Sequence, residues 1–414
     1  MTENTSIDQV KLDKLARLAI HTGVGLQKGQ NLIITAPVDS LPLVRLIAKH
    51  AYKAGAGLIT PFFSDSDITL SRYKYASNDS FDVAADWLYK GMGDAFDNNT
   101  ARMAIAGEDP MLLSEMDPEK VSRANKANSI AYKPARERIT QFDINWNIIS
   151  WPGVSWAKRM FPDLDTLEAQ SRLSEAIFLA SRVVEDDPVG AWKEHNKALR
   201  KRTDWLNGKN FRDLHFSGPG TNLKIGLADE HEWMGGASQA QNGVICNPNI
   251  PSEEVFTTPH ALRVEGHVSS TKPLSHQGSL IDEIRVEFKE GSIVEAKASK
   301  GERIFRKVLE SDEGARRLGE VALVPDSSPI SQSGLLFYNT LFDENAACHI
   351  ALGQCYSKCF KSKNNLSPEE VRSRGGNSSM IHIDWMIGSK EIDIDGIELN
   401  GEKIPIFRNG EWCD

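Results

Sequence analysis

A histidine and an aspartate that alternate with apolar residues are the first side chains in the sequence that could do chemistry. His382 and Asp384 lie in segment 380–387, whose alternation of polar and apolar residues predicts a β-strand. Residues two apart on a strand project from the same face. An imidazole nitrogen and a carboxylate oxygen held on one rigid face are ligands that zinc, cobalt and manganese accept. The pair therefore predicts a metal-binding position.

The same pair has a second interpretation, because a histidine and an aspartate spaced in this way also form surface ion pairs. Ile381 and Ile383 point to the opposite face and indicate a buried strand. A buried carboxylate is costly unless a cation compensates its charge. We therefore expect positive charge beside Asp384.

Three further positions carry candidate ligands. His349 begins an apolar, strand-like segment that follows a run of acidic and amide residues, and Tyr356 comes shortly after it. Glu253 and Glu254 form a doubled carboxylate before an apolar run, and Glu320 stands at a predicted change from helix to strand. Each of these carboxylates, taken alone, is better explained as a solvated surface group.

Other chemistries are disfavoured by residue spacing. Cys348, His349, Cys355 and Cys359 could form a zinc site, but they lack the close Cys-x-x-Cys pairs of structural zinc sites. No nucleophile-elbow pattern is present. The glycine pair of segment 23–25 precedes its strand, whereas a dinucleotide-binding loop follows one. A Rossmann oxidoreductase is therefore not expected.

The elements that must position these residues differ between the two halves of the chain. The first half alternates helix and strand patterns: a helix near 6–21, a strand from 32, a helix capped by Ser40 and a strand at 58–63. Short apolar strands at 103–106 and 147–150 flank a helical stretch at 118–138. This order predicts an α/β domain with a parallel sheet.

The second half is predicted to be β-rich, with a few helices. Hairpins are expected around the turns at 217–220 and 290–291, and segment 404–407, which follows Asn400 and Gly401, is expected to be the last strand of another hairpin. A helix is expected around 303–317. The turn-rich segment 207–210 is the best place to divide the chain. We therefore expect an N-terminal α/β domain, 1–207, and a C-terminal α+β metal-binding catalytic domain, 208–414.

Composition excludes several classes of function. The chain of 414 residues has 48 Lys and Arg against 57 Asp and Glu, a net charge of −9 that repels nucleic acid and anionic lipid surfaces. No apolar run is long enough to span a membrane, and the first residues lack the pattern of a secretory signal. Five cysteines, an odd number, fit reduced thiols better than disulfides. We expect a cytoplasmic protein without nucleic-acid or membrane partners.

Several longer motifs resemble one known family. They are NIPSEEVFT at 249–257, GEVALVP at 319–325, LFYNTLFDENA at 336–346, HIALG at 349–353, HID at 382–384 and IFRNGEW at 406–412. Together they are similar to the aminopeptidase T / aminopeptidase S family of metallo-aminopeptidases. The resemblance extends over essentially the whole chain and is strongest from about residue 211 onward.

This resemblance implies a two-domain, usually dimeric exopeptidase with two divalent ions (Zn, Co, Mn or Mg) that removes N-terminal residues from peptides with broad selectivity. The family's metal ligands fall on the residues already singled out, with Glu253 as the alternative if the register is off by one. They are Glu254, Glu320, His349, His382 and Asp384, with Tyr356 as the family's site tyrosine. The cysteines on either side of Tyr356 depart from the polar or small neighbours expected there.

The residues and the resemblance predict the same chemistry. Two cations roughly 3.5–4 Å apart can activate water and polarise a peptide carbonyl. Tyr356 could ligate a metal or donate to the oxyanion, and Glu253 is the candidate general base. Which ion takes which ligand stays open. Two alternatives also stay open: a non-catalytic, metal-stabilised module that binds a small ligand, and a two-metal phosphoesterase.

Overall fold

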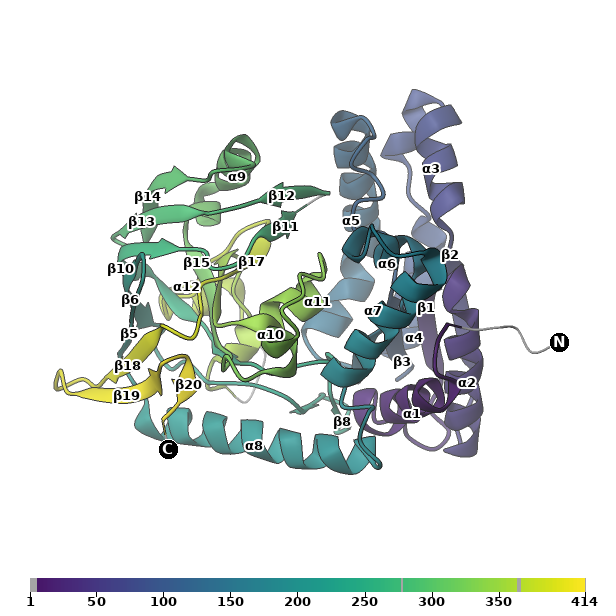
Figure 1. The fold of residues 1–414 in the computed structure, drawn as a ribbon, viewed down its shortest axis with the longest axis horizontal. Coiled ribbons are helices and arrows are strands. Elements are labelled where there is room, and N and C mark those ends of the chain that lie inside the picture. Colours follow the sequence, from purple (N-terminus) through teal and green to yellow (C-terminus); the bar gives the residue numbers. More distant parts are fainter. Residues whose placement is uncertain (1–5, 277, 363–365, 414) are drawn as a thin grey trace. The chain divides into compact units, whose positions relative to one another are not determined.

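The computed structural model describes residues 6–276, 278–362 and 366–413 (Figure 1). The chain forms two compact units, one made of Met1–His195 and Ala237–Pro251 and the other of Asn196–Gly236 and Ser252–Asp414. A separation into domains 1–207 and 208–414 stays a prediction. Within the described ranges, no helix combines the length and the hydropathy that a membrane span requires.

The first unit is built on a parallel sheet, as its alternating helix and strand patterns predict. The strand order is β2-β1-β3-β4, and every neighbouring pair is parallel. The strands are β1 (Leu32–Pro37), β2 (Ile59–Ser64), β3 (Ala101–Ala106) and β4 (Trp146–Ser150). The predicted α/β class of the first half is therefore confirmed.

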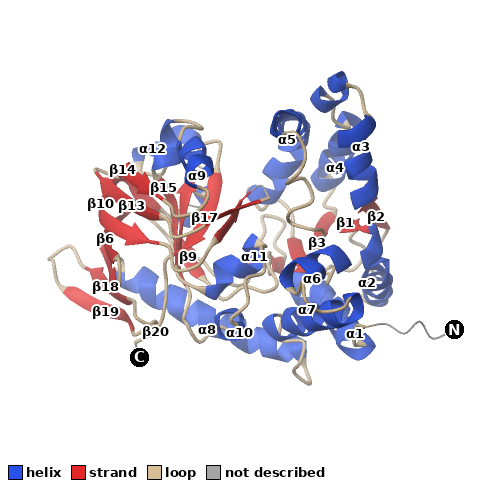
Figure 2. Ribbon diagram, turned by 45° about the horizontal axis from the view of Figure 1, so that its top comes forward, coloured by secondary structure: helices blue, strands red, loops and turns tan. Residues whose placement is uncertain are grey.

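Helices cover both faces of this sheet (Figure 2). Apolar residues of α1 (Gln9–Leu18), α2 (Leu41–Lys53) and α7 (Thr166–Ala180) share one core with the sheet, and those of α4 (Asp86–Asp97) and α5 (Pro118–Thr140) share another. The remaining elements are α3 (Ser66–Tyr75), α6 (Val154–Met160), β7 (Ser238–Gln239) and β8 (Ile245–Cys246). The long helix α8 (Pro188–Lys209) belongs partly to each unit.

Ser40 precedes helix α2 as predicted, but it does not cap the helix with its side chain. Its hydroxyl donates instead to the carbonyl of Pro37, and the helix begins with Pro42 in its first turn. The capping prediction was wrong because the hydroxyl closes a turn at the end of β1.

The second unit contains two large antiparallel sheets. The larger has the order β14-β13-β10-β6-β5-β18-β19-β20 and the smaller the order β17-β16-β15-β9. The strands of the larger sheet are β5 (Asp213–Gly218), β6 (Thr221–Leu227), β10 (Pro259–Ser269), β13 (Arg285–Lys289), β14 (Ser292–Lys297), β18 (Asp393–Ile397), β19 (Lys403–Arg408) and β20 (Glu411–Trp412). Those of the smaller are β9 (Val255–Thr257), β15 (Leu318–Leu323), β16 (His349–Gly353) and β17 (His382–Met386). A short pair, β11 (Leu274–His276) with β12 (Ser279–Ile281), stands apart. The hairpins predicted around 217–220 and 290–291 are present as β5–β6 and β13–β14.

One hydrophobic core joins the two sheets of the second unit. It takes Phe216 and Ile225 from the larger sheet and Val321, Ile350 and Trp385 from the smaller. Burying one face of the smaller sheet leaves its other face for polar residues. Besides the C-terminal part of α8, the α-helices described in this unit are α9 (Glu302–Leu309), α10 (Pro329–Ser333), α11 (Thr340–Asp343) and α12 (Pro368–Ser373).

One prediction of detail in this half was wrong. Helix α9 ends at Leu309, and Glu313–Arg316 forms a separate 3-10 turn capped by the side chain of Asp312, so the expected helix 303–317 is broken. The hairpin expected after Asn400 and Gly401 is present, because β19 pairs antiparallel with β18, and the turn at Asn409 and Gly410 adds the short strand β20 to it.

Candidate metal centre

The candidate ligands lie on the face of the smaller sheet that points away from the core. On β16, Ile350 and Leu352 enter the core, so His349 projects from the other face. On β17, Ile383 and Trp385 enter the core, so His382 and Asp384 project likewise. The strand predicted at 380–387 is thus present, and its histidine and aspartate share one face.

Glu320 reaches the same face through an irregularity in β15. Leu318 lies in the core, and residues two apart on a regular strand would share its face. The pairing with β16 shifts register between Leu318 and Glu320, which is the mark of a β-bulge. Gly319 sits in this bulge, where a Cβ would lie 2.4 Å from the carbonyl oxygens of Gly353 and Gln354. The bulge turns Glu320 toward the ligands.

Small residues leave room between the ligands. Ala351 pairs with Glu320 on one side and with Asp384 on the other, so a methyl group separates the two carboxylates. Gly353 pairs with His382 and has a φ of 104°. A Cβ at Gly353 would lie 2.2 Å from the carbonyl oxygen of Ile381, so this position requires glycine.

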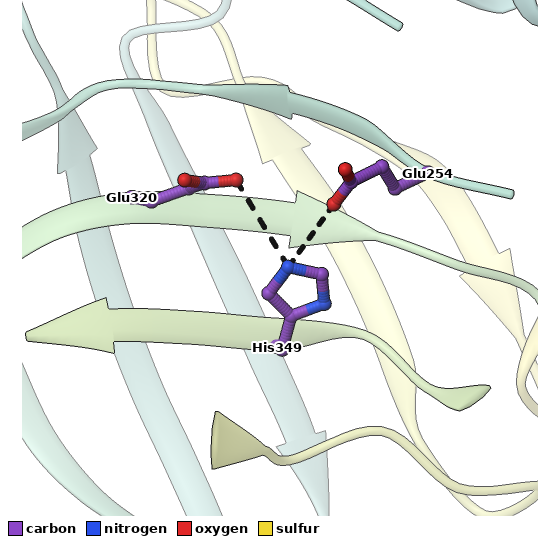
Figure 3. Close-up of side chains that lie close together, drawn as sticks. All are labelled: Glu254, Glu320 and His349. Atoms are coloured by element: carbon purple, nitrogen blue, oxygen red, sulfur yellow. Dashed lines mark ion pairs between the residues drawn. The ribbon is translucent and has the colours of Figure 1, made fainter. Parts of the chain in front are cut away.

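The side chains form two groups that share one residue. Glu254, Glu320 and His349 form the first group, and Glu320, His382 and Asp384 form the second, with the donor atoms of each group within 4.8 Å of one another. Figure 3 shows the first group, in which Glu320 on β15 and Glu254, just before β9, approach the His349 ring. Carboxylate oxygens and imidazole nitrogens are donors that zinc and other divalent metals accept.

The two oxygens of Glu320 face different histidines. Glu320 Oε1 lies 3.9 Å from His349 Nε2, and Glu320 Oε2 lies 3.3 Å from His382 Nε2. A carboxylate oriented in this way can give one oxygen to each of two cations.

Each histidine is oriented by a main-chain carbonyl. His349 Nδ1 lies 3.2 Å from the carbonyl oxygen of Ala347, and His382 Nδ1 lies 2.7 Å from that of Gln354. A carbonyl oxygen can only accept, so each Nδ1 carries the proton and donates it. In a neutral ring the lone pair then belongs to Nε2, which points at the carboxylates. This arrangement is typical of histidines that bind metals.

Two buried carboxylate oxygens have neighbours but no hydrogen bond. Glu254 Oε2 lies 3.1 Å from His349 Nε2, and Asp384 Oδ1 lies 3.3 Å from His382 Nε2, yet neither oxygen accepts a well-oriented hydrogen bond. A carboxylate oxygen and an imidazole lone pair at this distance repel each other unless a proton or a metal cation lies between them. The donor set therefore fits a cation.

The charges of the cluster shift the pKa values of its members. Burial lowers the pKa of His349, but Glu254, Asp384 and Glu320 outweigh burial and raise it to about 10. Burial raises the pKa of Glu320 to about 7, against the opposing effect of His382. The cluster draws protons because its potential is negative, and the same potential attracts divalent cations.

Two predicted residues lie beside the groups. Glu253 is buried and donates its backbone N–H to Asn345, but its side chain belongs to neither group. The ring centroid of Tyr356 lies 4.9 Å from that of His382. Tyr356 is 41% exposed, but protein surrounds its phenol on the side of the ligands. This desolvation, followed by the charges of Glu320 and Asp384, raises the pKa of the phenol well above its ordinary value. The phenol is therefore protonated at neutral pH and is able to donate.

Glu344 is a further residue beside the ligands that the sequence pattern did not predict. Burial, together with the charges of Glu254 and Asp384, raises its pKa well above the ordinary value, so its carboxyl group lies within the field of the ligands. It also lines a small cavity with Asp384, Leu274 and Met386. The sequence does show an acidic residue shortly before His349. The strand pattern that begins at His349 does not include Glu344, however, so it did not predict that this side chain lies beside the ligands.

The cysteines take no part in either group. Within the described residues, neither cluster of potential ligands contains a thiol. Cys348 donates to the carbonyl of Val324, and burial raises the pKa of Cys355 to about 11. Cys359 is also buried. Protonated, buried thiols of this kind are structural side chains rather than metal ligands.

Two groups of buried and half-buried donors that share one carboxylate define a candidate centre for two metal ions. The sequence matches the model of the thermophilic metalloproteases (M29) over residues 8–412, and the chain belongs to this family.

Relatives with known names support this membership. Aminopeptidase T of Thermus thermophilus is 49% identical over 401 residues, which cover 97% of this chain and 98% of the relative. Aminopeptidase 2 of Geobacillus stearothermophilus is 43% identical over 403 residues, with the same coverage of the two chains. The solved structure of wild-type AmpT from Thermus thermophilus matches with a TM-score of 0.93 at 48% identity and covers 98% of this chain and 99% of that one. The similarity to this structure also supports the mixed fold predicted from the sequence.

Proposed function

We propose that this protein is a metal-dependent aminopeptidase that holds two divalent cations in the candidate metal centre. The observation that carries the proposal is the position of Glu320, which belongs to both ligand groups and turns one oxygen toward each histidine. The names of the relatives, aminopeptidase T and aminopeptidase 2, support the peptide substrate.

The proposed ligands divide between the two cations according to the groups. Glu254 and His349 would hold one cation, His382 and Asp384 the other, and Glu320 would contribute to both. When bound, two divalent cations activate water and polarise the carbonyl of the scissile bond. Oxygen and nitrogen donors without thiolates suit Zn²⁺, Co²⁺ and Mn²⁺, with Mg²⁺ a further candidate.

The residues beside the ligands have proposed roles in proton transfer. Tyr356 keeps its proton at neutral pH, so its phenol can donate a hydrogen bond to the oxygen of the carbonyl under attack. A general base is also needed. Glu253 is the residue proposed from sequence, and Glu344 is a second candidate because it lines a small cavity together with Asp384. The Glu253→Gln and Glu344→Gln variants distinguish them, since only the loss of the base should remove the acidic limb of the pH–rate profile.

The proposal extends to substrate and setting. A negative cluster favours the positively charged N-terminus of a peptide, and the resemblance to broad-range aminopeptidases favours tolerance of many N-terminal residues. The resemblance also favours a homodimer in the cytoplasm, which size-exclusion chromatography with light scattering and cell fractionation test directly.

The function is tested by removing and restoring the metal. The purified protein is treated with a chelator, then assayed with an aminoacyl p-nitroanilide after addition of Zn²⁺, Co²⁺, Mn²⁺ or Mg²⁺. We expect turnover to disappear on chelation and to return with at least one of these ions. The N-acetylated form of the same substrate is the matched control and should resist cleavage, since an aminopeptidase requires a free amine.

Two results would contradict the proposal. Cleavage of p-nitrophenyl phosphate but not of the aminoacyl substrate would identify a two-metal phosphoesterase. Metal-dependent stabilisation without turnover of either substrate would identify a non-catalytic binding module.

A further inference from the structure

Glu254 lies just outside the hydrogen-bonded ladder of the smaller sheet. The ladder between β9 and β15 begins at Val255, so Glu254 and Glu253 precede the first paired residue. A carboxylate on such a segment loses conformational entropy when it binds a cation, unless another contact has already fixed its backbone.

The side chain of Asn345 supplies that contact. Its Oδ1 accepts the backbone N–H of Glu253 at 2.6 Å, and the residue is fully buried. Its Nδ2 donates to the carbonyl of Leu341 at 3.0 Å. The carboxamide thus joins the Glu253–Glu254 segment to the turn that precedes β16.

The turn to which Asn345 belongs lies next to other residues of the candidate metal centre. Asn345 lies within the 3-10 turn Glu344–Ala346, next to Glu344 and shortly before His349. The backbone carbonyl of Asn345 also accepts the hydroxyl of Ser328 at 2.9 Å, and Ser328 caps helix α10. The turn is therefore anchored from both its side chain and its main chain.

We propose that Asn345 is a positioning residue that fixes Glu254 against His349 before any cation binds. It touches neither the proposed cations nor the substrate and acts through the Glu253 backbone. The inference rests on the proposed function, because it assigns Glu254 to the metal centre. Groups that orient metal ligands in this way change affinity or activity by about 10–100-fold when they are removed.

The test compares Asn345→Ala with a matched control, Asn145→Ala. Asn145 is also a fully buried carboxamide that joins two segments, here of the first unit: its Nδ2 donates to the carbonyl of Val24 at 2.7 Å, and its Oδ1 accepts from Gln30 Nε2 at 2.7 Å. The control removes a similar pair of hydrogen bonds in the unit that carries none of the proposed ligands. The dissociation constant for Co²⁺ is measured on the chelator-treated full chains from the visible absorption of the bound ion, at a temperature where circular dichroism shows all variants folded.

We expect Asn345→Ala to weaken Co²⁺ binding by about 10-fold or more, and Asn145→Ala to change it by less than about 3-fold. Turnover of the alanine variant should fall at limiting Co²⁺ and recover at excess Co²⁺. Asn345→Asp keeps an acceptor for the Glu253 N–H, so its affinity should lie closer to wild type than that of the alanine variant. If the alanine variant does not fold, Asn345→Ser replaces it. We expect the same loss of Co²⁺ affinity, because the serine side chain is too short for its hydroxyl to reach the Glu253 N–H.

A lower melting temperature with unchanged Co²⁺ affinity in Asn345→Ala or Asn345→Ser would overturn the inference and leave Asn345 as a structural residue. This failure is distinguishable from failure of the proposed function. If wild-type protein neither binds Co²⁺ nor cleaves the aminoacyl substrate, the proposed function fails. If wild type does both and the Asn345 variants match it, only the positioning role fails.

Discussion

Glu254 and His349 come from distant parts of the chain, yet Glu254 Oε2 lies 3.1 Å from His349 Nε2 in a buried environment. Because His349 donates through Nδ1 to the carbonyl of Ala347, a neutral ring directs its lone pair at this carboxylate. The contact is stable only when positive charge lies between the two atoms, as a proton or as a cation. It links the fold of the smaller sheet directly to its proposed chemistry.

Replacing the shared carboxylate should affect both cations at once. In Glu320→Gln the side chain keeps its shape but loses its charge, so we expect both sites to lose metal together. The number of metal ions per chain is measured by inductively coupled plasma mass spectrometry. Turnover should fall by more than about 100-fold, the upper range for residues that only orient a ligand. Asp213→Asn is the control, since Asp213 is a buried acid of the same unit that pairs with Lys224 instead. Retention of two metals per chain in Glu320→Gln would exclude a shared ligand.

Filling the space between the ligands should remove metal binding without opening the core. Ala351 separates Glu320 from Asp384, and cross-strand neighbours lie about 4.5–5.5 Å apart at Cβ. In Ala351→Leu we expect loss of metal affinity, measured by Co²⁺ titration, because the larger side chain pushes the two carboxylates apart. Ala351→Gly, which adds no volume, should bind Co²⁺ like wild type. Equal binding by the leucine and glycine variants would show that the cluster is not formed on this face.

The neighbouring residue on the same strand should behave in the opposite way. Ile350 enters the core between the two sheets and is fully buried. Ile350→Ala should lower the free energy of unfolding by about 2–5 kcal/mol, measured by urea denaturation, since it creates a cavity. The folded protein should retain its metal content. A stability loss much smaller than this would mean that the core does not close over β16 as described.

Acid should destabilise the protein partly through His231. Burial lowers the pKa of this histidine to about 4, and its Nδ1 donates to the carbonyl of Ala228. In the unfolded chain this histidine binds a proton near pH 6.5, whereas in the folded protein it binds one only near pH 4. The stability that the neutral histidine contributes is therefore complete above pH 6.5 and is lost as the pH falls from 6.5 to about 4. The shift corresponds to about 3 kcal/mol.

The measurement compares the pH dependence of unfolding in wild type and His231→Phe. We expect the variant to lose less free energy between pH 7 and pH 4.5 than wild type, whatever its absolute stability, because phenylalanine does not titrate. Parallel curves for the two proteins would show that His231 is accessible to protons in the folded state.

The sequence predicted the ligand-bearing strands where the pattern was local. The alternation around His382 and Asp384 needs only the strand period, and the fold places both residues on one face as expected. The βαβ order of the first half similarly predicted its parallel sheet. Periodicity within one segment was sufficient for both.

What the pattern could not predict depends on contacts between segments. The orientation of Glu320 depends on a bulge at Gly319, and in segment 318–323 every residue is buried, so no alternation marks the two faces. Glu344 reaches the cluster through a 3-10 turn rather than a strand. Asn345 matters because of a hydrogen bond to a residue 92 positions away. Contacts of this kind arise only when the chain has folded.

The carbonyls of Ala347 and Gln354 that orient the two imidazoles belong to the main chain. Every amino acid offers the same carbonyl group, so substitutions at these two positions can change the side chain and still leave the histidine rings aimed correctly. The side chains at these two positions can therefore change during evolution, because the backbone alone sets the orientation of the His349 and His382 rings.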